Sequence, residues 1–546
     1  MMLAGFWRRL SRFLIINTLL LVVASCTLVD ERIDRAAGGP TVPADTDLHM
    51  RLESIDQPGE TPPRVISTDP LQITITEAIL LALENNRALV VERLNPSIQK
   101  TFEDQERSEF DPELNAEISA GRIEGERLAR SGSGSEDFTT DAAKGILSLE
   151  QFFPTGTTVA VEGSSQMTNS SLYANSFYSS RLGMTITQAL LRGYGSEVNL
   201  ANLQQARLDT RMSEYELRGF TESLVAQVER TYWDYALAGR QIEIFEESLK
   251  LARQQLTETE ELIIVGRLAK AELIAVQAEV AIQEQGLINA RSEMESIRLR
   301  LLRLLNPPGS RLWDRKVELI HQPTLPQIKL DDVELHVSVS MRMHPILNET
   351  RLGVMRGDLQ LIKTKNGLLP VLDLFITLGK SGYSGSFGDS VSDIYKDNYD
   401  ALAGVRFQYP IFKRDVKARH QRARLNRDRA QRALENLSQL LEVDVRTAYI
   451  EVHRAKQQIS ASSATRKFNE EKRRIENEKF RVGKSTSYLV AQAQRDLLVS
   501  RIAEVEAVAN YLVALVDLYQ NDGSLLERRG VSAPGRKPVT LLKKKK

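Results

Sequence analysis

Cys26 is the only cysteine in the 546 residues, so its thiol is the most distinctive reactive group in the chain. Three arginines within residues 8–12 give a positive start, and the run 13–24 that follows is almost wholly apolar. Small residues then lead to the cysteine. This order is typical of a secretory signal, and the apolar run is too short to cross a bilayer core, which needs about 20 residues. We expect residues 1–25 to be a signal peptide that is removed.

The approach to Cys26 resembles the bacterial lipoprotein box, in which the cysteine becomes the first mature residue and carries lipid, including palmitate. By that resemblance, Thr27 in place of an aspartate after the cysteine favours transport of the lipoprotein to the outer membrane. A buried cysteine or an ordinary signal cut elsewhere would also explain these residues, and both rank below lipidation because every feature falls in the required order. Residues 26–70 are then a lipidated tether, polar and proline-rich from residue 30.

Side chains that commonly carry catalysis or bind metals do not cluster in the sequence. No phosphate-binding glycine loop and no serine, histidine and acid grouping stands out, so we expect no catalytic residue, no cofactor and no enzyme activity. The 72 basic and 72 acidic residues cancel, which removes any long-range field toward nucleic acid. We also expect no metal, because the histidines show no ligand spacing; they are His49, His321, His336, His344, His420 and His453.

The chain repeats itself at an offset of 217 residues, which carries Gly266 to Gly483 and Tyr232 to Tyr449. The phrase "VGRLAKAELIAVQAEV" from Val265 shares its frame with "VGKSTSYLVAQAQRDL" from Val482. The sequence therefore predicts a tandem duplication.

Each copy predicts a long helical hairpin around its glycine. In the first copy apolar residues recur every seven positions, the spacing of a coiled coil. An ordinary amphipathic helix of a globular core would have a wider apolar stripe. In the second copy Arg466 and Arg473 interrupt the pattern, so that half is more polar. The first-copy positions are Val228, Tyr235, Ile242, Leu249, Leu256 and Ile263.

The lengths of the predicted helices require two short helices beside each long one. Residues 199–265 would span about 100 Å, whereas the returning helix 269–305 would span about 55 Å and the earlier helix 76–108 about 50 Å. The second copy repeats this with a long helix at 413–481 and short ones at 333–365 and 487–520. Pro96 and Pro345 should start or kink their helices.

Between the first helix and the long helix of each copy, apolar and polar residues alternate as in strands. Leu182, Met184 and Ile186 oppose Arg181, Thr185 and Thr187; similar alternation marks 113–120, 372–378 and 405–409. No second long apolar span follows the signal, so a membrane crossing would need strands with an apolar outer face. A half-buried soluble sheet would show the same alternation.

The first copy carries an additional strand pair, 146–153 and 157–163, joined at Pro154-Thr155-Gly156. This pair either joins a membrane barrel, giving six strands per chain, or folds over the barrel mouth or outside it. The glycine- and serine-rich stretches 131–137 and 381–392 predict exposed loops between strands.

The lipid cysteine, duplicated strands and duplicated hairpins together resemble the TolC-like outer-membrane efflux factor family, in its lipoprotein subtype, over residues 71–522. The phrases "SEFDPEL", "ITQALLRGYGSEVNLANLQQAR" and "FQYPIFKRDVKARHQRARL" agree with it. The resemblance implies a fold that is mainly α with membrane β: hairpins forming a periplasmic α-barrel, and strands contributing to one transmembrane β-barrel shared by a trimer. It implies an export duct in the bacterial outer membrane, fed by an inner-membrane transporter and a periplasmic adaptor.

The resemblance also implies functional residues at the hairpin ends. The positions that match the adaptor-docking tips are Val265, Gly266, Arg267, Val482, Gly483 and Lys484. A glycine helix stop followed by a basic residue needs no partner, so that simpler explanation stays open.

The aperture that the family closes with polar links departs from the family pattern here. Phe480 lacks a hydroxyl, and Leu489 and Gln492 stand where acids are expected. Glu272, Phe480 and Arg481 remain the aperture candidates.

The alternative is a lipid-anchored periplasmic coiled coil or adaptor that does not cross the outer membrane. An adaptor should have one hairpin between small β-domains, whereas this sequence has two hairpins, each entered from strands. A hydrolase is disfavoured because no catalytic grouping exists. The expected domains are the first repeat 71–305, a linker or equatorial segment 306–332, the second repeat 333–522 and a solvated basic tail 523–546.

Overall fold

The computed structural model of the protein describes residues 70–128, 132, 134–172, 175–309, 312–320 and 330–541. Cys26, the signal and most of the tether lie outside these residues. The described chain forms two compact units, one built from residues 99–209 and 354–430 and the other from 70–98, 210–353 and 431–541. Among the described helices, none is both long and apolar enough to span a bilayer.

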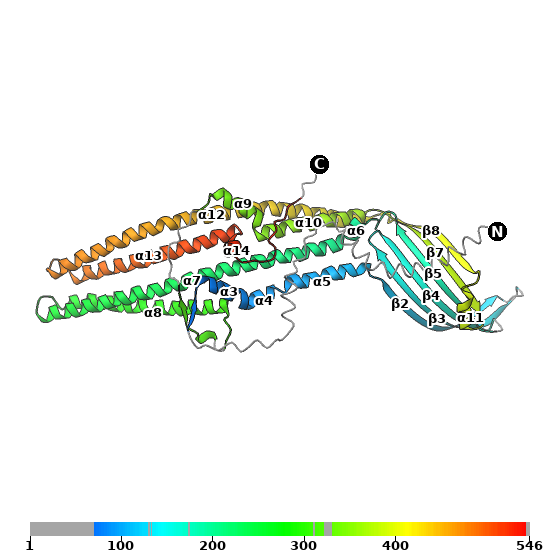
Figure 1. Cartoon of the computed structure of the whole chain (residues 1–546), viewed down its shortest axis with the longest axis horizontal. Helices are drawn as coiled ribbons and strands as arrows, with labels where there is room; N and C mark the ends of the chain where they lie inside the picture. The colour runs from blue at the N-terminus through cyan, green and yellow to red at the C-terminus, as the bar shows by residue number, and fades with distance from the viewer. Residues whose placement is uncertain are drawn as a thin grey trace. The chain divides into compact units, whose positions relative to one another are not determined.

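The first unit is built around one antiparallel sheet of six strands in the order β2-β3-β4-β5-β7-β8 (Figure 1). The additional strand pair of the first copy lies inside this sheet as β3 and β4, between β2 and β5. Folding of that pair away from the other strands is therefore excluded. The strands are β2 (Glu113–Leu128), β3 (Ser135–Phe153), β4 (Thr157–Ser170), β5 (Phe177–Ala189), β7 (Val371–Ser384) and β8 (Tyr399–Gln408).

The strand register gives the sheet one apolar and one polar face, because directly paired residues point to the same side. Met184 pairs with Val161 on one side and Leu378 on the other, and Leu149 pairs with Leu114 and Val161. The opposite face carries Glu113, Glu117, Ser148, Glu150, Glu162, Thr185, Thr377 and Arg406, and Ile146, Phe375 and Leu402 are among its apolar exceptions. The alternation is confirmed over the predicted segments of the six strands; farther along β2 and β3, the face of Leu114 carries the ion pair of Arg122 with Asp141.

The stretch 381–392 is exposed at most positions, as its composition predicts, but it is not a loop. Strand β7 continues to Ser384, and α11 (Phe387–Asp393) follows. The buried Ser390 lies 2.8 Å from the hydroxyl of Ser180 on β5. A side chain at Gly382 would collide with the backbone of α11, so the glycine allows this close contact. Residues 135–137 likewise belong to β3.

The long helices form as the apolar period predicts. They are α7 (Ala201–Ile264), α8 (Glu272–Leu305), α12 (Arg414–Arg481) and α13 (Ser487–Asn521). The short α6 (Ser196–Asn199) precedes α7. Arg466 and Arg473 interrupt the apolar pattern without breaking α12.

The predicted short helices are split. The segment 76–108 forms α3 (Ile75–Asn85), α4 (Arg87–Glu92), α5 (Asn95–Arg107) and the 3-10 turn η1 (Ser108–Phe110). The segment 333–365 forms α9 (Val333–Met343) and α10 (Pro345–Asn366). Proline stands at the start of α10 and at the second position of α5, where its missing N–H costs no helical hydrogen bond.

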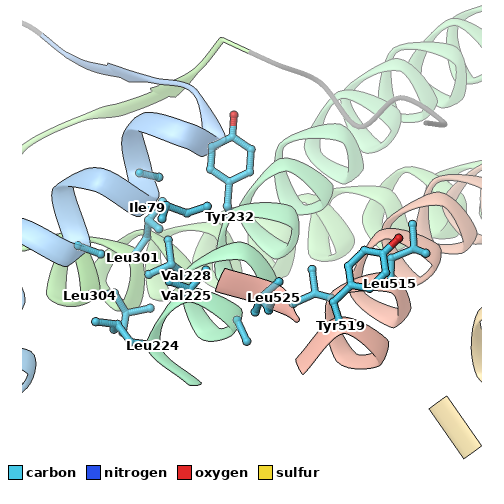
Figure 2. Close-up of a cluster of buried hydrophobic side chains, with 14 of the residues drawn as sticks. Ile79, Leu224, Val225, Val228, Tyr232, Leu301, Leu304, Leu515, Tyr519 and Leu525 are labelled. Carbon is cyan, nitrogen blue, oxygen red and sulfur yellow. The ribbon is translucent and has the colours of Figure 1, made fainter. Parts of the chain in front are cut away.

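The core of the second unit joins both copies of the repeat (Figure 2). Val225, Val228 and Tyr232 of α7 pack in one cluster with Leu301 of α8 and Tyr519 of α13, and none of these is more than 4% exposed. Burying each apolar side chain of this size contributes about 1.5–3 kcal/mol. Beside the cluster, β1 (Leu71–Ile73) pairs in parallel with β6 (Val317–Leu319), which follows η2 (Leu312–Asp314).

The described part of the C-terminal segment is not a solvated tail. It forms α14 (Leu525–Arg528), in which Leu525 and Leu526 are fully buried. Further on, the N–H of the buried Val539 donates to Asn348 at 2.9 Å. Polar composition misled the prediction, because the partners of this segment lie on α7 and α10, far away in the sequence.

Candidate functional site

The two hairpin ends have matching geometry. Gly266 and Gly483 both have a φ of +74°, and each lies one residue after an exposed valine. The N–H of Arg267 donates to the carbonyl of Leu262, and the N–H of Lys484 donates to that of Lys479, each at 2.8 Å. These bonds close both helices with a left-handed glycine, a conformation that costs other residues about 1–2 kcal/mol.

The tips present one valine and one cation each to the surroundings. Val265 is 66% exposed and Val482 is 67% exposed. Arg267 and Lys484 are exposed and make no ion pair with other residues in the described part of the chain. Each tip therefore places an exposed valine and an exposed cation on either side of a glycine turn.

Glu272, the first residue of α8, connects the first hairpin to the second. Its Oε2 accepts a hydrogen bond from the backbone N–H of Ser487 at 2.9 Å. Ser487 is the first residue of α13, and Thr486 already caps that helix by accepting from Leu489. A carboxylate at a helix N-terminus satisfies an unpaired N–H and interacts favourably with the helix dipole.

The other two aperture candidates, Phe480 and Arg481, take no part in this hydrogen bond. The Phe480 side chain is buried, with 5% of its surface exposed. Arg481 is exposed and has no ion-pair partner among the residues that the structure describes. Of the three candidates, Glu272 is the one with a hydrogen bond between hairpins.

A series of polar contacts between the hairpins was not anticipated from the sequence. Closest to the tips, Arg495 donates to Glu279, which is 1% exposed, at 3.0 Å. Farther along, Arg501 donates to Glu247 at 3.0 Å and Arg230 donates to Asp517 at 2.7 Å. Arg466, which interrupts the second copy's apolar pattern, forms an ion pair with Glu504 inside its own hairpin, so that interruption did not signal the contacts between hairpins.

The polar face of the sheet carries an ion pair between the two copies of the repeat. Arg181 on β5 contacts Asp400 on β8 at 2.7 Å, passing over Gly379 of β7. A side chain at Gly379 would collide with both groups. Nearby, the hydroxyls of Thr185 and Thr377 lie 3.0 Å apart. Charged and hydroxyl side chains on this face therefore pair with one another across the strands.

Among the described residues, no group of three or more His, Cys, Asp or Glu side chains is arranged to hold a metal ion.

Comparison with known proteins identifies the family to which the chain belongs. The sequence pattern of the outer membrane efflux protein family matches residues 147–307 and 342–524, more than half of the chain. A search of curated proteins found no match.

Solved structures show the same fold at low sequence identity. The outer-membrane channel OprN is 16% identical, with 82% of this chain and 90% of that chain covered and a TM-score of 0.63. The CmeC outer membrane channel of Campylobacter jejuni is 15% identical, with 83% and 86% covered and a TM-score of 0.60. The outer membrane protein VceC of Vibrio cholerae is 14% identical, with 82% and 96% covered and a TM-score of 0.61. On its sequence match and its fold, the chain belongs to the outer membrane efflux protein family.

Proposed function

We propose that three copies of the chain form an export duct in the bacterial outer membrane, which passively conducts substrates delivered by an inner-membrane pump and a periplasmic adaptor. The observation that carries this proposal is the six-stranded sheet with one apolar face, one polar face and two unpaired edge strands, β2 and β8. Exposed sheet edges cannot face lipid, so the sheet has to close.

Closure requires more than one copy. Known membrane barrels have at least about eight strands, so six strands cannot close alone. In a trimer, three chains of six strands supply 18. Barrels of about 16–18 strands leave an aqueous channel, in keeping with a duct for solutes.

The adaptor is proposed to bind the two hairpin ends, Val265-Gly266-Arg267 and Val482-Gly483-Lys484, which share one geometry. The lipid anchor at Cys26 is proposed from the sequence. Changing Cys26→Ser should abolish lipid labelling and signal processing, and an unchanged mass of the mature protein would remove the anchor from the proposal.

The alternative, a lipid-anchored coiled coil that stays in the periplasm, has less support. An adaptor should have one hairpin between small β-domains, whereas this chain has two hairpins and a six-stranded sheet with an apolar face. Planar bilayers separate the two functions: the purified full-length protein should give discrete conductance steps if it is a duct. A protein that binds membranes and never conducts would favour the alternative.

A further inference from the structure

The start of α12, directly after edge strand β8, is strongly basic. Residues 413–430 contain eight Lys or Arg and two Asp, a net charge of +6 in a chain whose total is zero. Lys417, Arg422, Arg424 and Arg429 are exposed and make no ion pair with any residue that the structure describes. Its first residues, Lys413 and Arg414, also stand at the N-terminus of α12, where positive charge is unfavourable. An anionic partner would relieve both costs.

The segment that leads into the other edge strand, β2, has the opposite charge. Residues 103–117 contain seven Asp or Glu and one Arg, a net charge of −6. Asp104, Glu106, Glu109 and Asp111 form no ion pair within the described chain. Desolvation by burial, followed by the charge of the neighbouring Glu106, raises the pKa of Glu109 against the lowering effect of Lys363.

The two charged segments meet the sheet at the same end. Because the six strands alternate in direction, β2 begins at the end where β8 finishes. Within one chain the segments lie at opposite edges. When β8 of one copy pairs with β2 of another, the basic segment of the first copy comes beside the acidic segment of the second.

The first copy of the repeat offers an internal comparison. Its long helix follows β5, which lies between β4 and β7 and has no free edge. The equivalent residues 196–213 contain two basic and two acidic side chains and are neutral. The charge is therefore found on the helix that leaves an edge strand, and not on the helix that leaves an interior strand at the same end of the sheet.

We infer that the basic segment 413–430 of one copy and the acidic segment 103–117 of the next form a charge-complementary interface that selects head-to-tail pairing of β8 with β2. The inference rests on the proposed assembly of several copies and adds the surface that directs it. A chain with two free edges can also pair β2 with β2 or β8 with β8. Parallel pairing of two like edges would place like charges together, which costs free energy and suppresses the wrong partner. Antiparallel pairing of two like edges would place the charged segments at opposite ends of the strands, so the attraction between basic and acidic segments would be lost.

Anionic lipid headgroups are the other partner that a basic segment beside a membrane strand could attract. Both long helices leave the sheet at the same end, so binding to headgroups would be equally open to the neutral residues 196–213. The acidic segment 103–117 would gain nothing from such a membrane surface. A second copy of this chain explains both segments together.

Charge reversal on full-length protein tests the interface through the rate of trimer formation in a pulse-chase experiment. Lys417→Glu with Arg424→Glu should slow assembly about tenfold, because steering between opposite charges becomes repulsion. Asp104→Lys with Glu109→Lys should do the same. The four changes combined should restore assembly, since the complementarity returns with reversed sign. Lys250→Glu with Lys467→Glu, the same charge change on exposed positions of α7 and α12, is the matched control.

The outcomes separate this inference from the proposed function. If trimers form at the normal rate in both double variants, the proposed interface is wrong, whereas the proposed export function is unaffected. Slow assembly with the basic reversal alone, without rescue by the acidic reversal, shows that the segment faces lipid and also overturns it. A wild-type protein that never forms trimers defeats the proposed assembly itself.

Disulfide trapping supplies a measurement that does not depend on assembly rate. Asp104→Cys and Arg424→Cys, made in separate chains and produced together, should give a crosslinked dimer that neither variant gives alone; the wild-type chain controls for Cys26. Trimers without this crosslink, or a crosslink between two copies of Asp104→Cys, would contradict head-to-tail pairing.

Discussion

The carboxylate of Glu272 accepts a hydrogen bond from the backbone N–H of Ser487 at 2.9 Å, although 215 residues separate them in the chain. Glu272 starts the returning helix of the first hairpin, and Ser487 starts that of the second. The contact therefore holds the two hairpins together within one copy, next to the tips.

Glu272→Ala should loosen the hairpins near the tips. Loss of a carboxylate at a helix N-terminus costs about 1 kcal/mol, which shifts a balance between closed and open ends roughly fivefold. Single-channel recording should show a larger fraction of open time. Glu258→Ala, at an exposed position of α7, should behave as the wild type; equal behaviour of the two variants would show that the contact does not restrain the aperture.

Arg495→Ala alone should destabilise the protein more than the double change of Arg495→Ala with Glu279→Ala. Glu279 is 1% exposed, so removing Arg495 leaves a buried carboxylate held only by Gln283, whose Nε2 donates at 2.7 Å. Breaking a buried pair in this way costs about 3 kcal/mol. Thermal unfolding of Arg495→Ala, Glu279→Ala and the double variant measures the coupling, and strictly additive losses would mean that the pair contributes nothing.

Reversing the tip charges should impair adaptor binding without affecting assembly. Arg267→Glu with Lys484→Glu changes two exposed cations beside the glycine turns and leaves both turns intact. Crosslinking to the adaptor and export should fall while trimers persist. The pair Lys250→Glu with Lys467→Glu again serves as the control, and normal crosslinking in the tip variant would move the docking surface elsewhere.

Single cysteines in β4 should report the two faces of the sheet. Val159 and Val161 lie on the apolar face, Thr158 and Glu162 on the polar face, and all four are half-buried in the single chain. A difference in labelling therefore reports the surroundings of each face. Cysteine at the valines should react with a lipid-soluble reagent, and cysteine at Thr158 or Glu162 with a water-soluble one. Aqueous labelling at all four positions would place this strand outside the membrane.

Glu222 should make stability depend on pH. Burial beside α14, with Glu527 and Asp522 nearby, raises the pKa of Glu222 from 4.5 to about 8 against the lowering effect of Arg218. Because the folded state holds the proton more tightly, this contribution is complete below pH 4.5 and is lost as the pH rises toward about 8. The free energy of unfolding should fall by roughly 4 kcal/mol across that range.

Glu222→Gln should flatten this dependence, whereas Glu216→Gln, at an exposed position of the same helix, should preserve it. Thermal unfolding of the three proteins between pH 5 and pH 8 provides the comparison. Parallel curves for the wild type and Glu222→Gln would show that Glu222 ionises at an ordinary pKa.

The sequence by itself determined the duplication, through its repeat at an offset of 217 residues, and its apolar period determined the four long helices and the alternating faces of the strands. These features depend on spacings within a few residues, such as the heptads from Val228 to Ile263, and on the repeat of Gly266 as Gly483. The glycine turns could be placed for the same reason, because a left-handed helix end is a local property of the backbone.

Only the tertiary structure decided how distant segments meet. Alternation shows that 146–153 and 157–163 are strands, but it does not show which strands they pair with. Their position between β2 and β5 is known only from the strand pairing in the structure. The contact of Glu272 with Ser487, the pairing of Glu279 with Arg495 and the burial of Leu525 join residues that lie far apart in the chain. A charged side chain carries no local sign of which distant partner it will find, because that choice is made by the packing of the helices.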